Sequence, residues 1–103
     1  MMPTTLADIR QFFGSGDNVI PTLGARGELT IRVTPTQILI LNGQGNGLTL
    51  TQNILDQVVI RRANLAASGE ENMASRYVYP RWPNPPAGQH TPSVPAVLRA
   101  MGR

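Results

Sequence analysis

The strongest chemical signal in the sequence is a segment in which arginines alternate with aromatic residues, at positions 76–83 (RYVYPRWP). Guanidinium groups bind carboxylates and phosphates through several N–H donors. Aromatic rings beside them stack on bases or pack against a protein partner. If this segment folds back over the end of the preceding helix, two more arginines join it. The candidate contact residues are then Arg61, Arg62, Arg76, Tyr77, Tyr79, Arg81 and Trp82.

The same aromatic residues have a structural interpretation, which stays open. Tyr77, Tyr79 and Trp82 would cover the open face of a sheet and close a small core, with the two tyrosines alternating along a strand. As a contact surface, the segment would instead bind another protein, a second copy of the chain, or the backbone of DNA or RNA. The salt dependence of binding distinguishes a nucleic acid from a protein partner, because binding to phosphate weakens steeply as salt is added.

The positive charge of the chain lies in its C-terminal part. All nine basic residues are arginine. Residues 61–103 hold six arginines and two glutamates, a balance of +4, whereas residues 1–60 hold three arginines and four acidic residues, a balance of −1. Because a basic surface attracts anionic partners, we expect contacts to form on the C-terminal part.

Residue types that support catalysis or metal binding are scarce. The chain has no cysteine, which excludes disulfides and thiolate metal sites, and its single histidine, His90, is too few for a histidine-based zinc site. Glu70 and Glu71 are adjacent, and such neighbours do not face each other across a cleft as a catalytic carboxylate pair does. We therefore predict no enzymatic activity, no cofactor, no metal and no small-molecule substrate.

A glycine-rich run at positions 42–47 (NGQGNG) follows the apolar residues 38–41 and precedes a predicted helix. A dinucleotide-binding turn needs the pattern G-x-G-x-x-G/A, and Leu48 stands where its third small residue belongs. A phosphate-binding P-loop needs a lysine, and the chain has none. We expect a hairpin turn in which glycine adopts a positive φ.

The spacing of apolar residues predicts an α+β fold with an N-terminal helix, a small antiparallel β-meander of three to four strands, and a packing helix. Thr5, with Asp8 three residues later, is a good N-cap for the first helix. Pro21 marks the first strand as an edge strand, because proline lacks the N–H that a ladder needs. The predicted strands and second helix are 19–23, 28–33, 38–41, 48–50 and 52–66.

From about residue 68 the composition changes, and six of the nine prolines lie between Pro80 and Pro95. Proline is excluded from helix interiors and central strands, so we expect an extended arm with a short terminal helix at 94–101. The predicted division is a compact α+β domain at 1–67 and a proline-, arginine- and aromatic-rich arm at 68–103. We expect the arm to pack on the same domain or on a partner subunit and to add little to the core.

Together these patterns predict a cytoplasmic interaction module without catalytic activity. The basic-aromatic arm would bind another protein or a second copy of the chain. A small DNA- or RNA-binding protein that contacts phosphate through the C-terminal arginines is the alternative. A core of this size is modest, which favours a homo-oligomer. The longest apolar run is too short to cross a membrane, so no membrane partner is expected.

Overall fold

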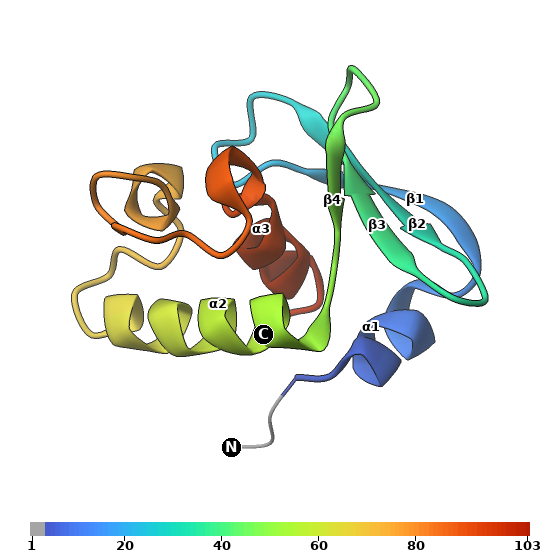
Figure 1. Cartoon of the computed structure of the whole chain (residues 1–103), viewed down its shortest axis with the longest axis horizontal. Coiled ribbons are helices and arrows are strands. Elements are labelled where there is room, and N and C mark those ends of the chain that lie inside the picture. Colours follow the sequence, from blue (N-terminus) through green and yellow to red (C-terminus); the bar gives the residue numbers. More distant parts are fainter. Residues whose placement is uncertain (1–3) are drawn as a thin grey trace.

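The computed structural model describes residues 4–103, which form a four-stranded sheet and three α-helices joined by two short 3-10 turns (Figure 1). The α+β class predicted from the sequence is confirmed. The order along the chain is α1 (Leu6–Phe13), β1 (Gly16–Pro21), β2 (Glu28–Val33), β3 (Ile38–Leu41), β4 (Gly47–Thr49), α2 (Gln52–Ala66), η1 (Ala74–Tyr77), η2 (Gly88–His90) and α3 (Ser93–Ala100).

The first helix begins at a reciprocal cap. The Thr5 hydroxyl accepts a hydrogen bond from the Asp8 N–H at 3.2 Å, and the Thr5 N–H donates to the Asp8 carboxylate at 2.9 Å. Two backbone N–H groups that have no partner within the helix are thereby bonded. The Thr5 N–H also holds the pKa of Asp8 below its usual value. The N-cap expected at Thr5 is confirmed.

The sheet is an antiparallel meander in the order β1-β2-β3-β4. Its register sets Ile31 opposite Ile40 and Val33 opposite Ile38, and all four side chains are buried. One face of the sheet is therefore apolar and forms a wall of the core. Strand β1 lies at the edge, as its proline predicts, although it starts at Gly16, earlier than expected, because its pairing with β2 extends that far.

The opposite face of β3 differs from the sequence expectation. Because residues 38–41 are all apolar, the sequence predicts a central strand that is covered on both faces. Leu39 and Leu41 are only partly buried, so this prediction is wrong for their face. Their neighbours across the ladder are Arg32 and Thr30, and polar neighbours of this kind leave the face in contact with water.

The glycine-rich run connects β3 to β4 as a hairpin, as predicted. The Asn42 side-chain oxygen accepts hydrogen bonds from the N–H groups of Gln44 and Asn46, at 2.9 and 3.0 Å. Gly45 has a φ of 80°. At Gly47, an added Cβ would lie 1.7 Å from the carbonyl oxygen of Ile40 on the paired strand. Close approach of two strands therefore requires glycine at this position.

Helix α3 lies against both α2 and β1, and Figure 1 shows it between the sheet and α2. Its residues Val94, Ala96, Val97 and Leu98 are at most 2% exposed. The expectation that residues 68–103 add little to the core is therefore wrong. Five consecutive residues, 94–98, are buried, so α3 is covered around most of its circumference.

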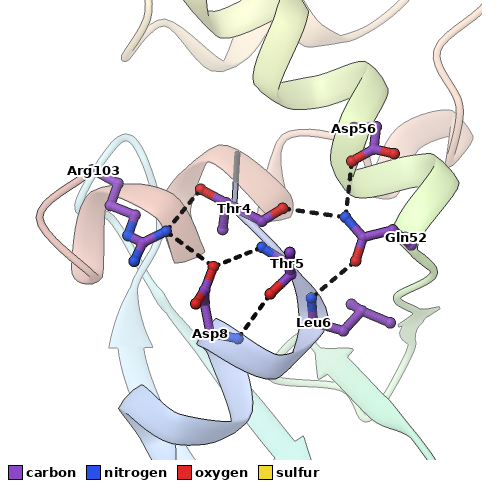
Figure 2. Close-up of polar contacts among 7 residues, drawn as sticks. All are labelled: Thr4, Thr5, Leu6, Asp8, Gln52, Asp56 and Arg103. Carbon is purple, nitrogen blue, oxygen red and sulfur yellow. Dashed lines mark hydrogen bonds and ion pairs between the residues drawn. The ribbon is translucent and has the colours of Figure 1, made fainter. Parts of the chain in front are cut away.

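Polar contacts join the start of α1, the start of α2 and the C-terminal residues (Figure 2). The Gln52 amide donates to the Thr4 carbonyl at 3.1 Å and accepts from the Leu6 N–H at 3.0 Å. The Arg103 guanidinium donates to the Thr4 hydroxyl at 3.2 Å and to the Asp8 carboxylate at 3.3 Å. Segments almost a full chain length apart are thus held side by side.

Within residues 4–103, every helix is too short or too polar to span a lipid bilayer.

Replacement of Gly47 by alanine should destabilise the fold by about 2 kcal/mol or more, because β4 must move away from Ile40. Gly43, in the same hairpin, is the matched control: a Cβ there meets nothing within 4 Å and its φ is not positive. Gly43→Ala should change stability by no more than about 0.5 kcal/mol. Urea unfolding of both variants measures the difference, and equal midpoints would contradict the close approach.

Candidate binding surface around Arg61 and Trp82

The predicted contact residues lie in α2, in η1 and in the turn after η1. Some of them are buried, some are hydrogen-bonded within the chain, and some are exposed. Tyr77 ends η1 and does not lie in a strand. Its ring is completely buried, and its hydroxyl donates to the Glu71 carbonyl at 2.6 Å. Tyr77 therefore closes the core and cannot contact a partner. Tyr79, two residues later, is 72% exposed.

Trp82 links the buried and the exposed parts of this segment. Its main-chain N–H donates to the Val78 carbonyl at 3.0 Å, which closes a tight turn. Its ring meets the edge of Tyr77, with ring centres 6.5 Å apart. The Arg61 guanidinium lies over the indole, with its carbon 5.4 Å from the ring centre. This is a cation–π contact, and it leaves Trp82 half-buried.

The Arg61 side chain holds this turn against α2. Its Nε donates to the Arg76 carbonyl at 3.2 Å, and its Nη2 donates to the carbonyls of Arg76 and Arg81 at 3.1 and 2.8 Å. Loop carbonyls have no ladder partner, so a rigid multi-donor side chain is well suited to satisfy them.

The other three arginines of the predicted set differ in availability. Arg62 donates to the main-chain oxygen of Arg103, and Arg76 forms an ion pair with Glu70. Both guanidinium groups are thus engaged within the chain. The Arg81 side chain is exposed and makes no hydrogen bond or ion pair with any residue of 4–103.

A shallow surface hollow of about 310 Å³ lies beside the indole. It is lined by Gln57, Ile60, Arg61, Asn64 and Trp82. The first four are spaced along one face of α2, and the side chain of Ile60 is 63% exposed. Sequence reasoning missed three of these residues, because polar side chains on a helix resemble an ordinary solvated face. The only sign of this surface in the sequence was Ile60, an apolar residue outside the core-facing stripe of α2.

Burial raises the pKa of Tyr77 to about 12. The nearby Arg62 and Arg61 charges act in the opposite direction, whereas Glu71 adds to the rise. The buried phenol is therefore neutral over the whole physiological range, and it serves as a hydrogen-bond donor.

A metal site needs several ligating side chains close together. In the part of the chain that the structure describes, no group of three or more histidine, aspartate or glutamate side chains is close enough to hold a metal ion. The arrangement around Trp82 is a shallow hollow lined by an isoleucine, the indole, two amides and one guanidinium group.

Comparison of the chain with protein-family models, with curated proteins and with solved structures gave no match.

Replacement of Arg61 by leucine should destabilise the fold by about 2–3 kcal/mol, because three carbonyl hydrogen bonds from a charged donor are lost. Arg81→Leu is the control, since that side chain makes no bond within residues 4–103, and it should change stability by no more than about 0.5 kcal/mol. Thermal unfolding compares the two. Equal effects would show that Arg61 does not anchor the turn.

Titration of tyrosine absorbance should reveal the buried phenol. In a Tyr79→Phe variant, Tyr77 is the only tyrosine left, and it should ionise near pH 12. Because folding raises this pKa above the ordinary value of 10.0, the phenol's contribution to stability is complete below pH 10 and is lost as the pH rises toward 12. Ionisation near pH 10 in a chain still folded by circular dichroism would contradict the burial of Tyr77.

Proposed function

We propose that this protein is a non-enzymatic interaction module that binds another protein, or a second copy of itself, through the surface around Trp82. We define this Trp82 surface by its exposed and half-exposed members, Ile60, Tyr79, Arg81 and Trp82. The observation that carries the proposal is that Ile60, beside the indole, and Tyr79, in the turn that contains Trp82, are 63% and 72% exposed. Arg81 of the same turn makes no hydrogen bond or ion pair within residues 4–103. Aromatic residues and arginine are enriched at protein interfaces.

A protein partner fits these side chains better than a nucleic acid does. Binding to single strands uses rings with free faces and arginines that follow the phosphates. Tyr77 is buried, and one face of Trp82 is covered by Arg61. Two further arginines of the set, Arg62 and Arg76, are bonded within the chain. Nucleic-acid binding stays the alternative, with Tyr79 as its main stacking residue.

Composition supports a cytoplasmic location for this activity. A chain without cysteine gains nothing from an oxidising compartment and is well suited to a reducing one. We propose the cytoplasm as the place where the partner is met.

Selection from a library of random displayed peptides tests the proposal with the purified chain. Peptides should be enriched on the natural sequence, and the enrichment should be lost on a Tyr79→Ala/Arg81→Glu double variant. The matched control is Val19→Ala/Arg26→Glu, which changes an exposed apolar residue and an exposed arginine on the sheet side of the molecule.

Enrichment on the control and not on the double variant supports the Trp82 surface. The proposal fails if no peptide family is enriched and the natural chain does not assemble, or if both double variants select the same peptides as the natural sequence. Sedimentation over a range of concentrations then distinguishes a foreign partner from a second copy. Assembly of the natural chain that the Tyr79→Ala/Arg81→Glu change abolishes indicates self-association.

A further inference from the structure

We propose that the Trp82 surface recognises an acidic segment of a partner protein, with one carboxylate bound at Arg61 and Arg81 and one apolar side chain in the hollow beside Ile60 and Trp82. This inference rests on the proposed function and names the chemistry of the partner. Four observations lead to it.

The first observation is the way in which Arg61 uses its donors. A guanidinium has five N–H groups. Nε and Nη2 donate three hydrogen bonds to the carbonyls of Arg76 and Arg81, which accounts for the one N–H of Nε and both of Nη2. The two N–H groups of Nη1 have no acceptor within residues 4–103, although Arg61 lines the hollow. One end of this guanidinium is therefore available to an outside acceptor.

The second observation is that the Arg61 charge is not neutralised by its own partners. All three acceptors are neutral carbonyl groups. The side chain is also fixed over the indole of Trp82, so a ligand would not have to immobilise it. A charged donor that is already in place favours a charged acceptor at low entropic cost. Arg81, in the same turn, adds a second cation that has no partner within residues 4–103.

The third observation is the lining of the rest of the hollow. Ile60 and Trp82 provide apolar surface, and the amides of Gln57 and Asn64 lie about one helical turn to either side of Ile60 and Arg61. A side-chain amide both donates and accepts, which matches the alternating N–H and C=O groups of a peptide backbone. A volume of about 310 Å³ is at the small end of ligand sites, and the hollow has room for an apolar side chain.

The fourth observation concerns the acidic residues nearby, which limit the length of any anion. Asp56 is one helical turn before Ile60, and its carboxylate accepts a hydrogen bond from Gln52 at 2.8 Å. Glu71 lies close to Tyr77, whose hydroxyl donates to the Glu71 main-chain carbonyl. A polyanion that runs along α2 would meet Asp56, whereas a peptide can place one carboxylate at the two arginines. The charge pattern therefore favours an acidic peptide over a nucleic acid.

The fluorescence of Trp82, the only tryptophan, measures binding directly on the full chain. Three short capped peptides are compared. The first has leucine flanked by aspartate and glutamate, the second replaces every acid by its amide, and the third keeps the acids and replaces leucine by alanine. The first should bind at least about tenfold more tightly than either of the others, because each of them lacks one of the two anchors. A short oligothymidylate should neither bind nor compete.

Variants of Arg81 and Ile60 test the carboxylate contact and the apolar contact separately. Arg61 is left unchanged because its replacement would destabilise the fold. Arg81→Gln should reduce the binding of the acidic leucine peptide several-fold and leave the amide peptide unchanged. Ile60→Ala should remove most of the advantage of leucine over alanine. Arg26→Gln, an exposed arginine on the β1–β2 hairpin, should alter neither affinity.

The inference is overturned if the amide peptide binds as tightly as the acidic one, if none of the three peptides binds, or if oligothymidylate binds instead. The library selection separates this failure from failure of the proposed function. Enrichment of neutral or basic peptides on the Trp82 surface would contradict the acidic ligand and still support the interaction module. Absence of both peptide enrichment and self-assembly would contradict both.

Discussion

Three hydrogen bonds from Arg61 to the carbonyls of Arg76 and Arg81 connect α2 to the first part of the C-terminal third of the chain. They hold η1 and the following turn against α2. As a result, Tyr77 enters the core, while Trp82 stops at the surface under the same guanidinium. The closure of the core and the shape of the Trp82 surface therefore depend on one side chain. A small domain buries a limited fraction of its surface and has few residues with which to do so. Here one arginine both anchors η1 and covers the indole.

Arginine serves as a donor to main-chain carbonyls in several other places. Arg10 donates to Thr34, and Arg99 donates to Thr22 and Leu23 at 2.8 and 3.0 Å. Loops leave carbonyl groups without ladder partners, and a guanidinium can satisfy two of them at once while staying charged. The arginine-rich composition thus has a structural role in the loops. It still contributes to the electrostatic field, because neutral acceptors do not cancel the charge.

Sequence patterns were sufficient where a local rule fixes the structure. The alternating pattern of residues 28–33 located β2, the apolar run at 38–41 located β3, and helical spacing located α2, all with the bounds observed. Local rules of this kind could not predict that Tyr77 is buried and Tyr79 is exposed. The two tyrosines differ only because η1 ends between them, and this turn depends on a contact with Arg61, fifteen residues earlier. Likewise, α3 could be located but not recognised as core, and Gln57 and Asn64 became site residues only through a distant tryptophan.

The contacts of Arg103 with Thr4 and Asp8 have a consequence for how this unit can be combined with others. The chain enters and leaves the described structure at nearly the same point, beside the start of α2 (Figure 2). A unit of this shape can be inserted into a surface loop of a host protein without stretching the loop open.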